Sequence, residues 1–215
     1  MTKVFALEPA PGPSGTTPAK VGGAPRPPGP ADWPACGQCG RPMRFLFQLP
    51  HRPDALLDLA PAQALLVFQC ENPDAACFPF DPDSGANRAL AVAAGSPAAM
   101  KGAPSAEEPY PERGLAFSAA EEDSAALSID VNGAGPEELE RRERAREQAP
   151  KSKVGGVPIW PQSEAAPSCC GEPMRFVAQL DGDTFGLSFG DGGTGFVFEC
   201  AKRCARRFKF LWQGY

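Results

Sequence analysis

Short segments in which apolar and polar residues alternate recur along the chain. In residues 43–49, the polar side chains Arg44 and Gln48 interrupt an apolar run, and this alternation predicts a strand. Residues 63–70 are mostly apolar and predict a second, largely buried strand, while residues 114–118 have the composition of an edge strand. Further strands are predicted at residues 87–92, 174–180, 184–189, 195–200 and 207–213.

Residues 136–148 have the features of a helix. Pro136 occupies the first turn, glutamates follow at once and arginines lie later, an order that complements the helix dipole. Because nearly every position is charged, the segment has no apolar stripe to bury. We therefore expect a solvated helix that bridges two parts of a sheet structure.

The segment 39–49 is repeated later in the chain as residues 170–180. Eight of the eleven aligned positions are identical, and no gap is needed. Two flanking motifs recur in the same order: Lys-Val-Gly-Gly-x-Pro at 20–25 and 153–158, and Val-Phe-x-Cys at 67–70 and 197–200. Three collinear matches of this kind indicate an internal duplication.

These patterns predict an α+β, β-rich fold with an internal duplication. We expect two small sheet-based halves, each with a cysteine knuckle, and one charged helix between them. The predicted divisions are a flexible Pro/Gly-rich tail at 1–19, a first repeat with a four-cysteine knuckle at 20–92, a linker and charged helix at 93–150, and a second repeat with a contracted knuckle at 151–215.

Composition narrows the class of protein. The 26 prolines and 23 glycines favour many turns, while the hydrophobic content of 42% is sufficient for a core. A net charge of −5 argues against general nucleic-acid binding. We find neither a signal peptide nor an apolar run long enough to span a membrane, so we expect a cytoplasmic protein. In that compartment, eight cysteines favour thiols or metal ligands over disulfides.

Four cysteines in the first repeat have a spacing typical of a metal site. They form a C-x2-C pair and, thirty residues on, a C-x6-C pair: Cys36, Cys39, Cys70 and Cys77. Four thiolates around zinc make a closed structural site. Buried free thiols and a redox pair are the alternatives. The redox alternative is disfavoured because Gly40, Pro42 and a strand follow the C-x2-C pair, where a thioredoxin-like site has a helix.

The second repeat departs from this spacing. Its cysteines are Cys169, Cys170, Cys200 and Cys204, and the two residues inside the knuckle are missing. Neighbouring side chains of an extended chain point to opposite sides. We therefore expect that Cys169 and Cys170 cannot both reach one metal without a bent backbone. The second site would be strained, three-coordinate or lost.

Other residues offer weaker candidates for chemistry. His51 is the single histidine and is expected to be an ordinary surface residue, which disfavours histidine-based catalysis. A carboxylate enzyme could be centred on Asp191 with Asp181 or Asp183, although aspartates beside glycines usually form turns. A nucleic-acid patch could combine Trp212 with the basic segment Lys202–Lys209. Its basic residues are Lys202, Arg203, Arg206, Arg207 and Lys209.

The repeated motifs resemble those of the YwqG-like family, bacterial proteins with a domain of unknown function. The resemblance rests on Lys-Val-Gly-Gly-x-Pro, Trp-Pro, Cys-Gly-x-Pro-Met-x-Phe-x-x-Gln-Leu, Phe-Gly-Asp-Gly-Gly and Phe-Leu-Trp-Gln, in residues 20–90 and 150–215. The first repeat is also similar to the programmed cell death protein 2 family, which includes chaperones of a ribosomal protein. The resemblance implies a duplicated β-rich fold that binds proteins.

Taken with the cysteine pattern, these features predict a non-enzymatic protein-binding module stabilised by structural zinc. Its role would be chaperone-like or inhibitor-like, with another protein as its partner. Neither a membrane nor nucleic acid is the expected partner. The carboxylate enzyme and the weak nucleic-acid binder are the alternatives to be tested against the structure.

Overall fold

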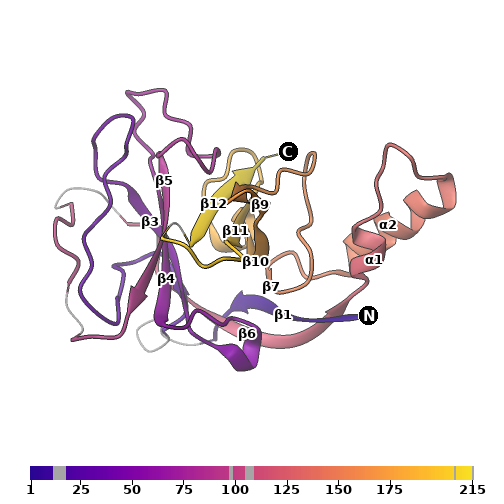
Figure 1. Ribbon diagram of the computed structural model, residues 1–215, viewed down its shortest axis with the longest axis horizontal. Coiled ribbons are helices and arrows are strands. Elements are labelled where there is room, and N and C mark those ends of the chain that lie inside the picture. The colour runs from indigo at the N-terminus through magenta and orange to yellow at the C-terminus, as the bar shows by residue number, and fades with distance from the viewer. Residues whose placement is uncertain (12–17, 97–98, 105–108, 206, 215) are drawn as a thin grey trace.

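A ten-stranded antiparallel sheet that nearly closes on itself dominates the computed structural model (Figure 1). The structure describes residues 1–11, 18–96, 99–104, 109–205 and 207–214. The strand order is β12-β11-β10-β7-β1-β6-β2-β3-β4-β5. The first five strands along the chain are β1 (Thr2–Pro9), β2 (Lys20–Val21), β3 (Arg44–Pro50), β4 (Ala62–Gln69) and β5 (Asn87–Ala93). The second five are β6 (Arg113–Glu122), β7 (Lys153–Val154), β10 (Arg175–Asp181), β11 (Thr194–Glu199) and β12 (Phe208–Gln213).

The two sets of five strands occupy equivalent places about the centre of the sheet. β1 and β6, the leading strands of the two sets, pair antiparallel at that centre along the whole length of β1. Each then pairs with the second strand of the other set: β1 with β7, and β6 with β2. The leading strands are therefore exchanged between the repeats, which ties the two halves into one sheet.

The duplicated sequence produces the same backbone irregularity twice. β3 and β10 each contain a bulge, at Leu46 and at Val177. In each repeat the bulged carbonyl accepts the first glycine amide of the Lys-Val-Gly-Gly motif, from Gly22 at 2.8 Å and from Gly155 at 2.9 Å. The internal duplication inferred from sequence thus extends to the hydrogen bonds of the fold.

Three apolar clusters fill the sheet structure. The largest packs side chains of both repeats together, with Phe47 and Phe210 in contact at 6.1 Å between ring centroids. A second cluster packs Phe45 and Phe68 against the loops of the first repeat, and it includes Cys36 and Cys70. Its counterpart in the second repeat is built around Trp160 and includes Cys200. The cysteines thus lie at the margins of two satellite cores, one in each repeat.

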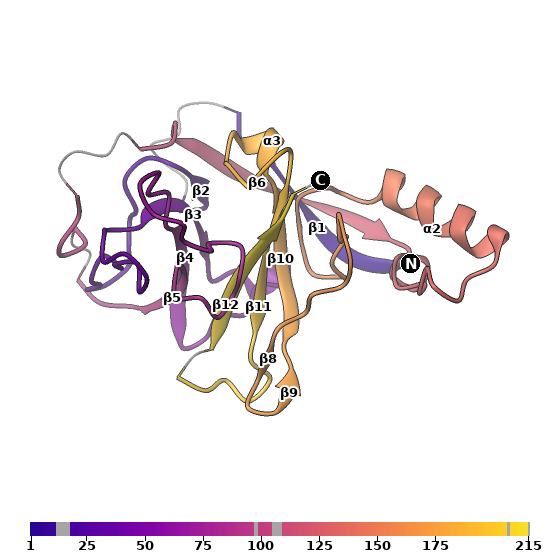
Figure 2. The ribbon, with the colours of Figure 1, turned by 90° about the horizontal axis from the view of Figure 1, so that it is seen from above.

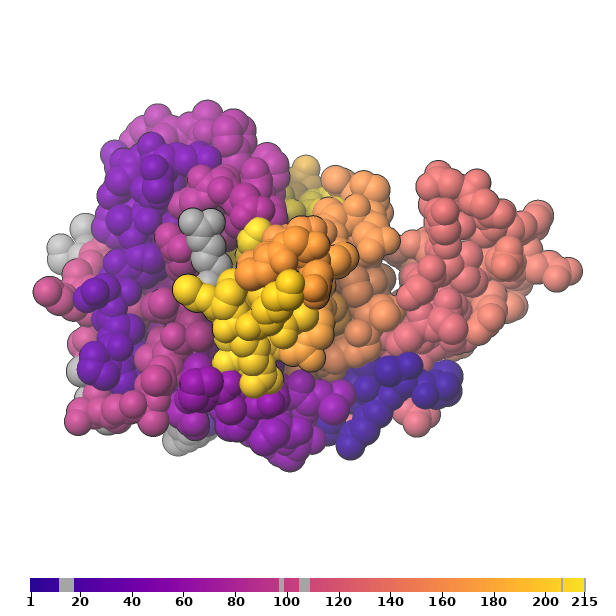
Figure 3. Space-filling view, in the orientation of Figure 1, coloured from indigo at the N-terminus to yellow at the C-terminus, as the bar shows by residue number. Residues whose placement is uncertain are grey.

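The helices are few and mostly peripheral. They are a short 3-10 turn (Pro53–Ala55), α1 (Ser124–Leu127), α2 (Pro136–Gln148) and α3 (Gly182–Phe185). α2 begins and ends where the sequence predicted the charged helix, and Ala145 is its buried residue. Together α1 and α2 form a lobe that projects from the sheet body (Figures 1 and 3). In the part of the chain that the structure describes, no helix is both long and apolar enough to cross a membrane.

Three sequence-based expectations need correction. The tail at 1–19 is not wholly flexible, because residues 2–9 form β1 at the centre of the sheet, whereas residues 12–17 lie outside the described residues. The segment 114–118 belongs to β6, a central strand and not an edge, so the predicted linker contains a core element. Residues 184–189 are no strand, because Asp181 caps α3 there and accepts the Thr184 amide.

Candidate metal centres

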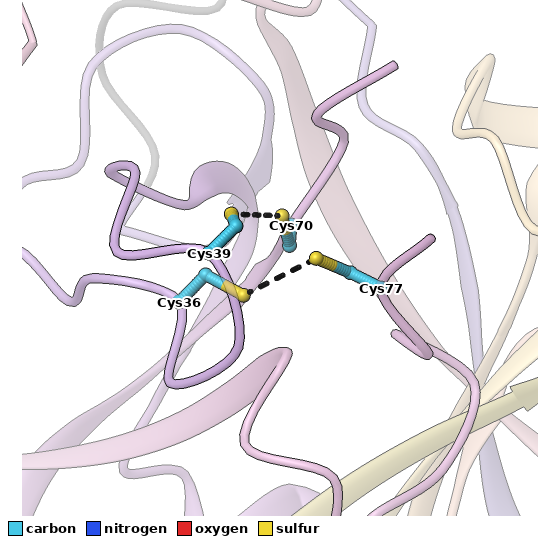
Figure 4. A group of neighbouring side chains, drawn as sticks. All are labelled: Cys36, Cys39, Cys70 and Cys77. Carbon is cyan, nitrogen blue, oxygen red and sulfur yellow. Dashed lines mark hydrogen bonds between the residues drawn. The ribbon is translucent and has the colours of Figure 1, made fainter. Parts of the chain in front are cut away.

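In the first repeat, the four predicted cysteines converge on a single point. The Sγ atoms of Cys36 and Cys77 are 3.7 Å apart and those of Cys39 and Cys70 are 3.6 Å apart. All four sulfurs lie within 4.8 Å of one another. Figure 4 shows the side chains pointing towards a common centre from three separate segments. Tetrahedral thiolates about 2.3 Å from a metal stand roughly 3.8 Å apart, so this cluster has the dimensions of a four-sulfur metal site.

Local backbone geometry forms the first half of this site. The Gly40 amide donates to the Cys36 carbonyl at 2.8 Å, which closes a turn around the pair. Gly40 has a φ of 73°, a conformation that glycine adopts at little cost. The Gln38 amide is 3.4 Å from the Cys36 sulfur. The C-x2-C segment is therefore a knuckle whose amides wrap around the sulfurs.

The second half of the site comes from the end of β4 and the loop after it. The Cys70 amide donates to the Ala86 carbonyl at 2.7 Å and continues the pairing of β4 with β5. Gln38 joins the knuckle to the loop, since its side chain accepts the Phe78 amide at 3.1 Å. Cys36 and Cys70 are 2% and 3% exposed. A metal here would cross-link segments that are about thirty residues apart in sequence.

All four cysteines of the second repeat also come together, which corrects the expectation of an incomplete site. The Sγ atoms of Cys169 and Cys204 are 3.3 Å apart, those of Cys169 and Cys170 are 3.8 Å apart, and the four sulfurs lie within 4.8 Å of one another.

A tight turn achieves this convergence. Cys169 ends β8 (Ser168–Cys169), which pairs with β9 (Glu172–Pro173). Cys170 and Gly171 between them have φ angles of 54° and 81°, as a two-residue hairpin turn requires. The bend replaces the missing two residues and turns both sulfurs to one side.

Backbone amides favour the thiolate form at one sulfur of each cluster. The Arg41 amide donates to the Cys39 sulfur and lowers the pKa of that thiol to about 6. In the second cluster, the Cys204 amide lowers the pKa of the Cys200 thiol to about 6. Burial raises the pKa of the Cys70 thiol. Thiolates are the form of cysteine that binds metal, so the donating amides favour metal binding.

Each cluster could therefore hold one metal ion, and all eight cysteines are free of disulfide bonds. Four sulfur ligands complete a tetrahedral shell, which has no open position for water or substrate. Such a site stabilises the fold and does not itself catalyse a reaction. The donor set suits zinc or another thiophilic metal.

The alternative candidates lie apart from these clusters. Asp191 and Asp183 are exposed, and buried Asp181 accepts from the Thr184 amide and hydroxyl as a helix cap. The structure does not bring these carboxylates into a pocket with a reactive partner among the described residues. His51 is part-buried, and its Nδ1 accepts the Leu59 amide at 2.9 Å. Its role in the structure is to hold a loop.

The basic segment of the second repeat is engaged in ion pairs within the chain. Lys202 pairs with Glu172, Arg203 with Asp58, Arg207 with Glu199, and Lys209 with Asp83. Arg206 lies outside the described residues. Trp212 packs between Phe80 and Phe189. The contacts of Arg203 with Asp58, Lys209 with Asp83 and Trp212 with Phe80 join the two repeats and give the segment a structural role.

A groove lies between β5 and β12, the two edge strands of the sheet. It has a volume of about 370 Å³ and is lined by the start of β5 and β12 and by the loop at 82–85. A neighbouring hollow of about 480 Å³ is lined by Phe80, Leu211 and Trp212. Edge strands on opposite sides of a nearly closed sheet meet only in three dimensions, so no local sequence signal could locate this groove.

Comparison with known proteins adds no assignment. No protein-family model matches the sequence, and no curated protein matches it significantly.

Proposed function

We propose that this protein is a cytoplasmic, non-enzymatic protein-binding module with one structural zinc ion in each repeat. The observation that carries the proposal is the convergence of two complete four-cysteine clusters on equivalent positions of the duplicated fold. Four thiolates match the ligand preference of structural zinc, and the cytoplasm would keep them reduced. The resemblance to the YwqG-like family and to the programmed cell death protein 2 family points to the same protein-binding role.

The partner would bind at the open seam of the sheet, between β5 and β12. In β5, the hydrogen bond from Cys70 to Ala86 fixes which residues face β4. Alternation along an antiparallel pair then leaves the backbone groups of Asn87, Ala89 and Ala91 directed at the seam. In β12, the hydrogen bond from the Cys200 amide to the Arg207 carbonyl fixes in the same way which residues face β11. The backbone groups of Phe208, Phe210 and Trp212 are then directed at the seam.

An extended peptide segment of the partner is the occupant we propose for this seam. Cα atoms of β5 and β12 approach within 8 Å of each other, so the two edges must separate to admit an added strand. Unpaired strand edges recruit an added strand through main-chain hydrogen bonds. Arg88, Arg207 and Lys209 line the groove together with a single acid, Asp83. Arg88 is exposed and forms no ion pair within the described part of the chain. Arg207 and Lys209 are already paired with Glu199 and Asp83. Among the described lining residues, the charge of Arg88 is therefore what favours an acidic side chain in the peptide, and the hollow beside Trp212 would accept an apolar one.

Elemental analysis of protein purified without chelators tests the metal part of the proposal. We expect two zinc ions per chain and a cooperative loss of structure when they are removed by a strong chelator. One zinc per chain would restrict the proposal to one repeat. Protein that contains no metal and folds stably without it would refute the zinc assignment.

Fluorescence polarisation with labelled peptides tests the binding surface. The probes are a peptide of alternating glutamate and valine and its lysine–valine counterpart, and we expect the acidic one to bind about tenfold more tightly. Ala91→Pro should abolish this binding because it removes an outward amide from an edge strand without touching the pairing with β4. Ala91→Val keeps the amide and should bind normally. Equal binding by the proline and valine variants would contradict strand addition at the seam.

A further inference from the structure

The two cysteine clusters differ in how much of them reaches solvent. In the first, Cys36 and Cys70 are buried at 2% and 3% exposure, and the other two cysteines are part-buried. In the second, Cys200 alone is buried and Cys170 is exposed. Oxidants attack thiolates in proportion to their accessibility, so the second cluster is the more open to them.

The Sγ atoms of Cys169 and Cys204 are closer together than the paired sulfurs of the first cluster. Cys169 and Cys204 are separated by 3.3 Å between Sγ atoms, against 3.6 Å and 3.7 Å for the pairs in the first cluster. A disulfide bond is about 2.05 Å long, so closing this pair requires a movement of only about 1.3 Å.

The segments that carry this pair lie outside the strands of the main sheet. Cys169 lies in the β8–β9 ribbon, a two-stranded sheet separate from the ten-stranded one. Figure 2 shows this ribbon at the far end of the second repeat, beyond β10 and β11. Cys204 lies in the loop between β11 and β12, where residues 201–203 and 205 are exposed. In the first repeat, Gln38 joins the knuckle to the Cys77 loop through the Phe78 amide and the Ser84 carbonyl. In the second, the exposed Lys202 joins the loop to the ribbon through the Glu172 carboxylate and the Cys170 carbonyl.

We propose that Cys169 and Cys204 form a site of reversible oxidative modification, which closes to a disulfide on exposure to peroxide and releases the metal of the second cluster. The release rests on the proposed zinc site; the disulfide pairing rests on the sulfur geometry alone. The first cluster keeps its metal under the same conditions.

The oxidant of this reaction is hydrogen peroxide or an organic hydroperoxide. One thiolate attacks a peroxide oxygen, the O–O bond breaks, and a sulfenic acid forms with loss of hydroxide from hydrogen peroxide or of an alkoxide from an organic hydroperoxide. The second thiolate attacks the sulfenic sulfur, the S–S bond forms and a second hydroxide leaves. Two protons convert both hydroxides into water when hydrogen peroxide is the oxidant. The two sulfurs lose two electrons, which the peroxide gains.

The metal leaves because half of its ligands are consumed. Cys170 and Cys200 remain as two thiolates, and two sulfur ligands hold zinc far more weakly than four. The new disulfide still joins the β8–β9 ribbon to the β11–β12 loop, so the repeat keeps its fold after the metal has left. A thiol reductant with added zinc would restore the original site.

Peroxide titration of the full-length, zinc-loaded protein tests the inference. Zinc release is followed with a chromogenic chelator, and disulfides are mapped by mass spectrometry after alkylation of the free thiols. We expect one zinc per chain to be released about tenfold faster than the second, together with a Cys169–Cys204 disulfide. Equal rates, or earlier oxidation in the first cluster, would overturn the proposal.

Two further experiments test whether oxidation occurs specifically between Cys169 and Cys204: one uses the Cys204→Ser variant, and the other uses protein without bound metal. Cys204→Ser should abolish the disulfide, and mapping of the wild type decides the pairing even if that variant folds poorly. If the purified protein contains no zinc, the proposed function fails, and peroxide is then applied to the metal-free thiols. Preferential pairing of Cys169 with Cys204 would still support the oxidation site, whereas no pairing or a different one would refute it.

Discussion

The ammonium group of Lys153 contacts the carboxylate of Glu122 in the interior of the protein, and both side chains have 0% exposure. The first repeat contains the matching pair, Lys20 and Glu112, with 2.5 Å between Nζ and Oε2. The two glutamates lie at opposite ends of β6, at its last residue and immediately before its first. This central strand is therefore clamped to each repeat by a buried lysine.

The glycine pairs of the Lys-Val-Gly-Gly motif make room for these carboxylates. A Cβ atom on Gly156 would fall 2.1 Å from Oε1 of Glu122, and one on Gly23 would fall 2.2 Å from Oε2 of Glu112. Both glycines also have positive φ angles, of 72° and 62°. The motif is thus explained as a carboxylate cradle beside a buried lysine.

Breaking the Lys153–Glu122 pair should destabilise the protein strongly. Lys153→Met leaves the carboxylate buried without its counter-charge, and Glu122→Gln does the same to the ammonium, so each should cost about 3 kcal/mol in free energy of unfolding. The double variant buries no charge, and we expect its loss to be about 1–3 kcal/mol smaller than the sum. Urea unfolding of all four proteins measures this coupling.

A surface pair provides the control for this cycle. Arg144 and Glu140 on α2 are 60% and 69% exposed. Glu140→Gln should leave the unfolding curve almost unchanged, because solvent screens exposed pairs. If the buried pair gave effects as small as the exposed one, the clamp would have no role in stability.

The close approach of glycine to glutamate leads to a second prediction. Gly156→Ala should destabilise the fold by more than about 3 kcal/mol, since it combines an unfavourable φ with a clash against Glu122. Gly186→Ala is the matched control, because Gly186 has a φ of 69° but no atom near its Cβ position. It should cost only about 1 kcal/mol. Thermal unfolding measures both effects. Equal decreases in melting temperature for the two variants would show that the contact with Glu122 does not constrain Gly156.

The pair in the first repeat predicts a dependence of stability on pH. Burial alone would raise the pKa of Glu112, but hydrogen bonds from Lys20 and Arg26 outweigh it and hold the pKa below its usual 4.5. A carboxylate with a lowered pKa in the folded state stabilises the fold above its unfolded pKa, and this contribution disappears as the pH falls through the folded pKa.

The comparison of wild type with Glu112→Gln isolates this contribution. We expect the variant to be less stable at pH 7, and the difference to shrink as the pH falls below 4.5. The difference is read from urea unfolding at several pH values, with Glu164→Gln as an exposed control. A difference that grew at acid pH would have the wrong sign for this ion pair.

Much of the fold could be predicted from sequence because its signals are local. The charges and Pro136 set the bounds of α2, alternation located β3, and an apolar run located β4, each within a residue or two. The cysteine spacing also identified the first group of four sulfur atoms, whereas it left the second as strained, three-coordinate or lost. For the helix and these strands, the pattern and the structure depend on the same few consecutive residues.

The rest depends on contacts between distant segments. β1 follows no clear alternation, since Val4 and Leu7 are its buried residues, and it is a strand because β6 and β7 pair with it. The burial of Lys20 and Lys153 depends on glutamates 92 and 31 residues away along the chain. The turn at Cys170 was not predicted because residues other than glycine rarely adopt a positive φ. Cys170 does adopt one, with a φ of 54°, and the four sulfurs of the second cluster come together at this turn.

Cys39→Ser and Cys169→Ser should differ in their effect on structure but not in the number of zinc ions lost. Sequence spacing alone predicted a much smaller effect for Cys169→Ser, since Cys169 was the ligand least able to reach a shared metal. Because the structure places both sulfurs inside complete clusters, each substitution should remove one of two zinc ions. The structural consequences should differ. Structural zinc contributes on the order of 10 kcal/mol to the folding of small zinc-binding peptides, and this free energy is lost wherever the metal joins otherwise separate segments.

The first cluster fixes long loops over the apolar cluster of Phe45 and Phe68, so Cys39→Ser should expose the first repeat to protease. The second cluster holds the short β8–β9 ribbon, so cleavage in Cys169→Ser should be confined to that ribbon and the loop before β12. Limited proteolysis read by mass spectrometry, with zinc content measured on the same samples, separates these outcomes. Cys169→Ser protein that retained two zinc ions would show that Cys169 is not a ligand, because a closed four-sulfur site depends on each of its thiolates.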